Sequence, residues 1–335
     1  MKNLGNGTVT FDEKPSVLSC CAVVGKKEGD GPYGKYFDRI EEDAYFGQDS
    51  WEKAESENLR RSVSLTLKKG GFRADDIDFS ISGDLLNQCI SSGYALRRLG
   101  IPFFGVYGAC STMVESMVLG SLIISGGGAE RILCSTSSNF CSAEKQFRTP
   151  LEYGGQRTPT SQWTVTGSGS VILGKGENPP FVEAVTCGKI VDLGIKDISN
   201  MGAAMAPAFV DTVKNHLNAL GRTPDYYDLI LSGDLGTVGK SIAEELFERD
   251  CVEIGDNYND CGVMIFDGEK QDTHAGGSGC GCCAVTLCGH ILKQLEAGAF
   301  RRVLFIPTGA LTSQTSFNEG QTIPGIAHGV VLERV

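Results

Sequence analysis

An internal repeat is the feature that most restricts the fold of this 335-residue chain. Residues 225–235 repeat the pattern of residues 75–85: aspartate at the first and fourth positions, a short strand, and the sequence Ser-Gly-Asp-Leu. Each segment follows a helical stretch that ends in glycine, at Gly71 and at Gly221. A shared order of strands and helices at a spacing of 150 residues indicates the duplication of an α/β unit.

A second pair of matching segments defines the extent of the repeat. Gly128–Arg131 and Gly298–Arg301 share the pattern Gly-Ala-x-Arg, lie 170 residues apart, and each leads into a predicted strand. The longer spacing means that the second copy carries 20 more residues before this point. We predict two α/β halves of five strands each, spanning residues 1–175 and 176–335 and stacked around buried central helices.

Cys110 lies at the centre of the first copy. Residues 101–107 form an apolar, aromatic-rich run that predicts a buried strand, and Gly108 with Ala109 allows a sharp turn. From Ser111 onward, apolar residues cover nearly the whole surface of a predicted helix, which is typical of a helix buried on all sides. At the N-terminus of such a helix, free N–H groups and the helix dipole favour a thiolate. Cys110 is therefore a nucleophile or part of an anion site, unless it is simply a small buried residue.

The second copy brings a histidine toward the same region. At the 170-residue spacing, Cys110 corresponds to Cys280, which begins the second central helix. A pseudo-twofold axis between the copies would bring the two helix N-termini close together. The extra residues of the second copy include residues 272–279, in which His274 precedes a glycine-rich run. We therefore predict that His274 lies beside Cys110.

The composition limits the classes of function. The formal net charge of −11 argues against nucleic acid as a partner, and an anionic ligand then needs a local positive patch or a bound cation. Thirteen cysteines without a zinc-binding spacing predict a reducing compartment and no metal site. No apolar run reaches the roughly 18 residues that cross a bilayer, and a signal-peptide pattern is missing. Any membrane association is expected to be peripheral.

Motifs in both halves point to a known superfamily. The duplicated halves, with Cys110 at the first central helix and His-Ala-Gly-Gly-Ser-Gly from His274 before the second, resemble the thiolase superfamily. Within it, the glycine-rich strand Trp163–Leu173 and the segment Asp225–Gly239 are similar to β-ketoacyl-acyl-carrier-protein synthase III. The resemblance implies a thiolase-like α/β fold.

Three further motifs narrow the resemblance. Val106–Met113, Glu152–Trp163 and Ile323–His328 are similar to the stage V sporulation protein AD family of the spore VA set. This resemblance implies a protein of spore-forming bacteria that binds dipicolinic acid (pyridine-2,6-dicarboxylic acid). The spore VA set moves dipicolinate and its calcium chelate into the forespore.

The same resemblance implies partners and a location. The implied protein partners are other spore VA membrane proteins, and the implied location is the spore inner membrane, through peripheral attachment. No resident cofactor is expected, and Ca²⁺ would enter only as the chelate with dipicolinate. A homodimer is expected by analogy with the superfamily.

The alternative function is an acyl-transferring condensing enzyme of the synthase III type. In that case Cys110 would be the nucleophile and His274 the second catalytic residue, while the N–H groups of Cys110 and of Gly309 or Ala310 would form an oxyanion hole. The chain departs from the synthases at Asp234, which stands where they place a histidine. A carboxylate opposes a developing enolate, so the sequence favours a binder over an enzyme.

For the binder, we predict a thiolase pocket converted to hold a small flat dicarboxylate. The candidate ligand-binding residues are Cys110, His274, His328, Arg157, Asp234 and Gly309. Arg157 suits a bidentate carboxylate contact, although a solvated arginine is the ordinary state in such a loop. His328 follows an insertion, Thr312–Gly325, that interrupts a glycine-rich loop and can cap the pocket. Asp234 is either a pocket residue or a helix cap.

Overall fold

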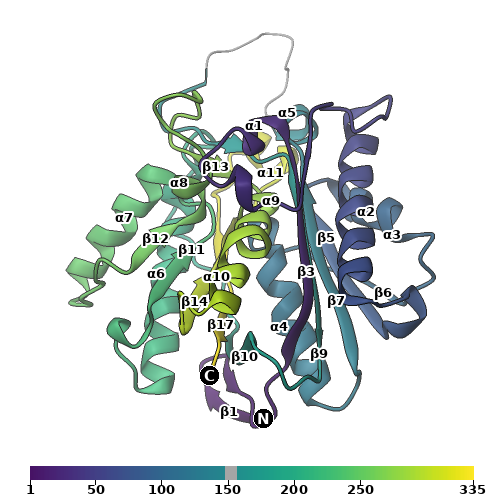
Figure 1. Ribbon diagram of the computed structural model, residues 1–335. Coiled ribbons are helices and arrows are strands. Elements are labelled where there is room, and N and C mark those ends of the chain that lie inside the picture. The colour runs from purple at the N-terminus through teal and green to yellow at the C-terminus, as the bar shows by residue number, and fades with distance from the viewer. Residues whose placement is uncertain (148–156) are drawn as a thin grey trace.

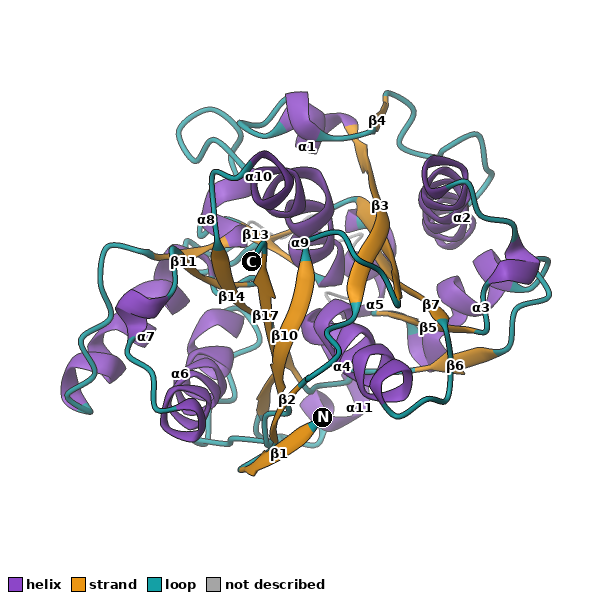
Figure 2. Ribbon diagram, turned by 60° about the horizontal axis from the view of Figure 1, so that its bottom comes forward, coloured by secondary structure: helices purple, strands orange, loops and turns teal. Residues whose placement is uncertain are grey.

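Ten strands of the computed structural model, which describes residues 1–147 and 157–335, form two sets with the same pairing order (Figures 1 and 2). The first set is, in spatial order, β3 (Ser16–Gly25), β9 (Gly167–Gly174), β7 (Arg131–Ser138), β5 (Phe79–Asp84) and β6 (Phe103–Gly105). The second set is β10 (Phe181–Thr186), β17 (Gly329–Glu333), β14 (Arg302–Ile306), β11 (Leu229–Ser232) and β12 (Tyr258–Asp260). In each set the first two pairings are antiparallel and the last two are parallel.

This repeated order confirms the duplicated α/β fold that the Ser-Gly-Asp repeat predicts. β3 and β10, the inner strands of the two sets, meet through a single residue pair, Ser16 and Phe181. The division of the chain after residue 175 stays a prediction. The remaining short strands are β1 (Lys2–Gly5), β2 (Thr8–Thr10), β4 (Arg39–Glu41), β8 (Trp163–Thr164), β13 (Gly277–Ser278), β15 (Thr308–Ala310) and β16 (Gly325–Ala327).

Helices cover the outer faces of the strand sets and fill the space between them (Figure 2). The first half contributes α1 (Lys26–Gly29), α2 (Trp51–Gly70), α3 (Ile90–Leu96), α4 (Thr112–Ser125) and α5 (Phe140–Phe147). The second contributes α6 (Met201–Leu220), α7 (Gly236–Arg249), α8 (Cys261–Ile265), α9 (Cys280–Thr286), α10 (Leu292–Ala297) and α11 (Gln314–Asn318). In Figure 1, α2 and α3 lie on one side of the molecule and α6 and α7 on the other.

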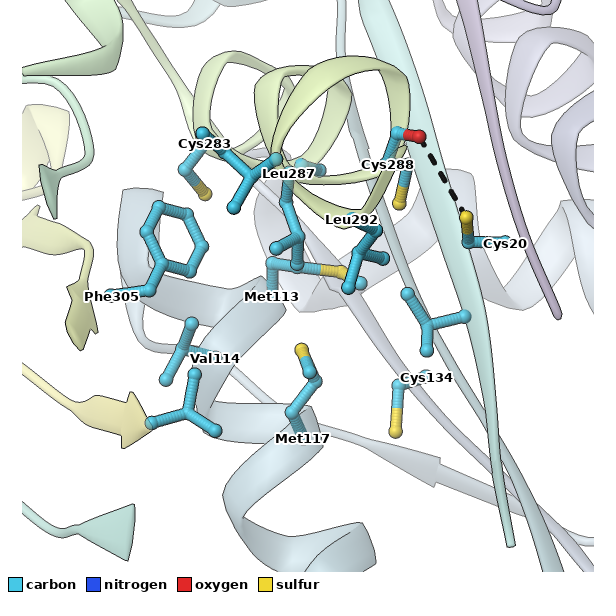
Figure 3. Close-up of a cluster of buried hydrophobic side chains, with 14 of the residues drawn as sticks. Cys20, Met113, Val114, Met117, Cys134, Cys283, Leu287, Cys288, Leu292 and Phe305 are labelled. Carbon is cyan, nitrogen blue, oxygen red and sulfur yellow. Dashed lines mark hydrogen bonds between the residues drawn. The ribbon is translucent and has the colours of Figure 1, made fainter. Parts of the chain in front are cut away.

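The two central helices form the core between the strand sets. Figure 3 shows Met113 and Met117 of α4 facing Cys283 of α9 and Leu287, which continues the second helix. All four side chains are fully buried. The prediction that the helix after Cys110 is buried is therefore confirmed for most of its surface; Leu119, which is 37% exposed, is an exception.

The strand that precedes Cys110 differs from the prediction of a buried strand. β6 lies at the edge of the first set, where it pairs with β5 on one side. Phe103 is 42% exposed and Phe104 is 49% exposed. The apolar run marks an uncovered edge because, in the described part of the chain, no strand pairs with its other side.

In the described residues, no helix has the length and apolar character needed to cross a membrane.

Candidate functional site

A cavity of about 80 Å³ opens at Cys110, and both halves of the chain build it. Its polar lining consists of Tyr107, Cys110, Glu144, Thr164, Ser278 and Thr312. Its apolar lining consists of Leu85, Ala109, Ala143, Phe147, Ile198, Met201, Met205 and Ala310. The cavity therefore combines apolar walls with a few thiol, hydroxyl and carboxyl groups, as small-molecule sites do.

The turn before α4 positions Cys110. Ala109 has a φ of +49°, a left-handed conformation that is costly for a residue with a side chain. Gly309 of β15 packs against the same turn, and a Cβ added at Gly309 would lie 2.1 Å from the carbonyl oxygen of Gly108. Glycine at position 309 is thus required by close backbone approach, which holds Cys110 at the cavity.

The carboxyl group of Asp234 is a close neighbour of the Cys110 thiol. It accepts hydrogen bonds from Thr308 Oγ1 at 2.8 Å, from Ser278 Oγ at 3.1 Å and from the backbone N–H of Gly279 at 3.2 Å. The Cys110 thiol lies close enough to this carboxyl group for the two to influence each other's pKa. The structure therefore brings together three residues that the sequence singled out: Cys110, Asp234 and Gly309.

This arrangement reverses the expected ionisation of Cys110. Burial raises the pKa of the Cys110 thiol well above its usual value, and the negative charge of Asp234 raises it further. Burial also raises the pKa of Asp234 to about 7. The helix dipole was expected to favour a thiolate, but desolvation and the neighbouring carboxyl group outweigh it, so the thiol is neutral near pH 7.

The second central helix reaches the same point. The Cys283 thiol donates a hydrogen bond to the backbone carbonyl of Cys110 at 3.4 Å. Ser278, which lines the cavity, lies two residues before α9 begins at Cys280. The N-termini of the two central helices therefore meet, as the duplication predicts.

His274 and Arg157 come together elsewhere, around Asp272. His274 Nε2 lies 3.6 Å from the Asp272 carboxylate, and Arg157 donates from Nη2 to the Asp272 backbone carbonyl at 2.7 Å. The Arg157 guanidinium also stacks over the Trp163 ring at 4.7 Å. Neither His274 nor Arg157 is among the described residues that line the cavity at Cys110. A ligand-binding role for these two residues stays a prediction.

His328 contacts the backbone at Gly188. Its Nδ1 accepts a hydrogen bond from the backbone N–H of Gly188 at 3.3 Å, and burial lowers the pKa of the ring to about 4. The imidazole is therefore neutral at physiological pH and brings no positive charge. His328 is not one of the described lining residues either, whereas Thr312, at the start of the insertion, is.

Several lining residues were not identified from the sequence. Ser278 stands in the glycine-rich run after His274, and that spacing is a signal that could have found it. Tyr107 stands in the motif Val106–Met113 but was not singled out as a site residue. Glu144 offered no such signal, because a lone glutamate is ordinary in a sequence. Of the predicted motif Glu152–Trp163, residues 152–156 lie outside the described residues.

The described part of the chain contains no group of three or more histidine, cysteine, aspartate or glutamate side chains that could hold a metal ion.

Comparisons with known proteins agree in sequence and in fold. Residues 5–333 match the sequence model of the family described as stage V sporulation protein AD. The stage V sporulation protein AD of Bacillus subtilis (strain 168) is 45% identical over 334 residues, which cover 100% of this chain and 98% of that protein.

Solved structures of lower identity share the fold. The 3-oxoacyl-[acyl-carrier-protein] synthase III of Aquifex aeolicus VF5 has a TM-score of 0.58 at 12% identity, covering 95% of this chain and 99% of that one. Cerulenin-bound OleA of Xanthomonas campestris has a TM-score of 0.61 at 12% identity, covering 96% and 98%. Human mitochondrial 3-ketoacyl-CoA thiolase in complex with CoA has a TM-score of 0.58 at 11% identity, covering 98% and 100%. At such identities the likeness shows the thiolase-like fold alone.

The proximity of Asp234 predicts slow alkylation of Cys110. At pH 8, iodoacetamide is expected to modify Cys110 more slowly than the exposed Cys187. Asp234→Asn removes the neighbouring charge and is expected to raise the Cys110 rate by about 3- to 10-fold, since each pKa unit is a tenfold change in thiolate. Peptide mass spectrometry resolves the individual cysteines.

Asp84→Asn is the matched control for this experiment. Asp84 is also buried, but its carboxyl group accepts hydrogen bonds from Ser92 and from the N–H of Leu86. An equal effect of both substitutions on Cys110 would contradict a direct influence of Asp234.

Proposed function

The chain belongs to the stage V sporulation protein AD family, and from that premise we propose that it binds dipicolinic acid in the cavity at Cys110. The binding would serve uptake of dipicolinate into the forespore during sporulation. One observation carries the proposal: apolar walls enclose a slot whose end is built by the Ser278 hydroxyl and the protonated Cys110 thiol. Because dipicolinate is larger than the cavity of about 80 Å³, apolar walls such as Leu85 and Met205 would have to move apart to seat its ring, with a carboxylate near Ser278 and Cys110.

The charge of the site indicates how a dicarboxylate would be held. Glu144, which lines the cavity, and Asp234, which is buried next to the lining residue Ser278, are acidic, and no lysine, arginine or histidine is found among the described residues that line the cavity. An ionised Asp234 would repel a ligand carboxylate near Ser278, whereas a protonated Asp234 would not. Calcium dipicolinate is neutral and avoids the same repulsion. The proposal therefore includes two bound forms: dipicolinate with a protonated Asp234, and the calcium chelate.

An acyl-transferring condensing enzyme is the second candidate, favoured by the fold and by Cys110 at a helix start. The raised pKa of the Cys110 thiol, caused by burial and by the charge of Asp234, opposes it, because acyl transfer needs a thiolate or a base that generates one. In the described part of the chain, no histidine lines the cavity.

The proposed setting is the forespore side of dipicolinate transport. Attachment to the spore inner membrane would be peripheral and would depend on other spore VA membrane proteins. The family assignment supports this location.

A second copy of this chain is proposed as a further partner, joined at β6. This edge strand exposes Phe103 and Phe104, and Tyr107, which lines the cavity at Cys110, is 42% exposed beside it. Unpaired strand edges with apolar side chains are ready sites for pairing with another chain. Pairing of two β6 strands would cover these rings and bring the partner close to the mouth of the cavity.

Calorimetric titration with dipicolinate and with calcium dipicolinate tests the binding site. Cys110→Ala and Ser278→Ala are each expected to weaken binding by about 2- to 10-fold, the effect of one lost hydrogen bond. Cys187→Ala, an exposed cysteine away from the cavity, is the control and should leave the affinity unchanged.

Other outcomes separate the alternatives. If only His274→Ala and Arg157→Ala weaken binding, the ligand lies at the Asp272 cluster and the assigned cavity is wrong. Absence of binding to either form rejects the proposed function. An acyl adduct on Cys110 after incubation with acetyl-coenzyme A would favour the enzyme instead.

Binding of free dipicolinate is expected to depend on pH through Asp234. The pKa of Asp234 is about 7 in the free protein, and a bound carboxylate raises it further, so binding takes up a proton. Affinity should therefore rise as pH falls from about 8 to 6, by at most tenfold per unit for one proton. Titrations in buffers of different ionisation enthalpy measure the proton uptake.

Asp234→Asn is expected to bind with little pH dependence, since its amide is uncharged at every pH. Asp84→Asn should keep the dependence of the wild type. Proton uptake that persists in Asp234→Asn would contradict the role of this carboxyl group without rejecting the binding.

Self-association through β6 is tested by sedimentation velocity. The wild-type protein is expected to sediment as a dimer and Phe104→Glu as a monomer, because a buried, unpaired carboxylate at the strand edge opposes pairing. Phe317→Glu, at a ring of α11 that is 40% exposed, introduces the same charge elsewhere and should remain dimeric. A monomeric wild type would reject the proposed partner.

A further inference from the structure

A groove of about 580 Å³ lies between α2 and the end of α3, and basic side chains form much of its lining. Lys53 and Arg60 come from α2, while Arg97 and Arg98 follow α3 directly. None of these residues lines the cavity at Cys110. The groove is therefore a separate surface that the proposed binding of dipicolinate does not use.

The helix pair fixes the position of these side chains. Lys53, Glu57 and Arg60 recur at intervals of three and four residues, so they share one face of α2. Ala95 of α3 is buried in one apolar cluster with Leu59 of α2, which anchors the two helices to each other beneath the groove. The groove is thus a preformed feature of packed helices.

The charges of the groove are only partly compensated. Glu57, its one acidic lining residue, already accepts hydrogen bonds from Arg60 at 2.6 Å and from Arg61 at 2.8 Å. In the described part of the chain, Arg97 and Arg98 form no ion pair with a carboxylate. Two exposed guanidinium groups are therefore available to an anionic partner.

A hollow in the second half carries the opposite charge. It lies beside α7, which follows β11 as α3 follows β5, and its described lining includes Glu244, Glu248 and Glu253 beside Lys240. No described residue of α6 lines it, whereas residues of α2 form one wall of the basic groove. A basic groove stands out in a chain with a net charge of −11.

An exposed aromatic ring borders the basic side chains. Tyr94 is 54% exposed, and the guanidinium of Arg97 lies 4.6 Å from the centre of its ring. Ile90, one helical turn earlier on α3, is 43% exposed. Tyrosine and arginine are the residue types enriched at the energetic centres of protein interfaces.

We propose that this groove docks an acidic, extended segment of a partner protein. Arg97 and Arg98 would each bind a carboxylate through their paired N–H groups, and Tyr94 would pack against an apolar side chain of the segment. The shape favours a chain segment over a lipid surface, because the cations line a concavity between two helices and a flat bilayer would reach only its rim. Lys53 and Arg60 would contribute less, because Lys53 already pairs with Asp49 at 2.7 Å and Arg60 with Glu57 at 2.6 Å.

Fluorescence anisotropy with a defined peptide tests the docking. The probe is a fluorescein-labelled decapeptide of glutamate and aspartate with one central leucine, titrated with the full-length protein. Arg97→Glu/Arg98→Glu is expected to weaken binding at least tenfold. Wild-type binding should also weaken as salt rises from about 50 to 200 mM, since exposed charges are screened over that range.

Matched controls distinguish local charge from global charge. Arg249→Glu/Arg301→Glu changes the net charge equally at exposed positions in the second half and should leave peptide binding unchanged. A peptide with glutamine and asparagine in place of the acids should not bind. Circular dichroism should show that both double variants keep the wild-type fold.

Two results would overturn the proposal. One is peptide binding that is absent or insensitive to Arg97→Glu/Arg98→Glu. The other is that the wild-type protein binds phosphatidylcholine vesicles containing phosphatidylglycerol but not the peptide, and that Arg97→Glu/Arg98→Glu abolishes the binding to these vesicles. The surface would then recognise lipid head groups.

Discussion

Close packing of the two central helices against the strand sets is the constraint on which the rest of the structure depends. A Cβ added at Gly169 of β9 would lie 2.6 Å from the carbonyl oxygen of Ala284 in α9, and one added at Gly281 would lie 2.6 Å from that of Gly167. Strand and helix can approach this closely only because these positions lack side chains. Since α9 is fixed in this way, its N-terminus meets the start of α4 at Cys110, where the Cys283 thiol donates to the Cys110 carbonyl, and the cavity is built where they meet.

The same packing determines the chemistry of the site. Removal of water from Asp234 and Cys110 raises the pKa of both groups, and the negative charge of Asp234 raises the pKa of the thiol further, so that the thiol stays protonated. A helix N-terminus would favour a thiolate in isolation, but its effect is small beside desolvation next to a carboxyl group. The start of the first central helix thus carries, in this chain, a protonated thiol beside a carboxyl group whose pKa is raised to about 7.

Charge is distributed unevenly between the duplicated halves. A basic groove lies beside α2 and α3 and an acidic hollow beside α7, although the strand order of the two halves is the same. Fold is set by apolar periodicity and close packing, and neither constrains exposed side chains on outer helices. The charges of the outer surfaces can therefore differ between the halves while the strand order stays the same.

The sequence by itself determined the duplication, the buried central helices and the place of Cys110, because repeats and apolar periodicity are local signals that survive without a structure. It also singled out Asp234, through its position in the second Ser-Gly-Asp turn. Only the tertiary structure decided that His274 joins Arg157 at Asp272, that β6 is an exposed edge, and that the Cys110 thiol is neutral. Spacing along a chain cannot give these results, since side-chain direction, strand neighbours and desolvation arise only when distant segments pack together.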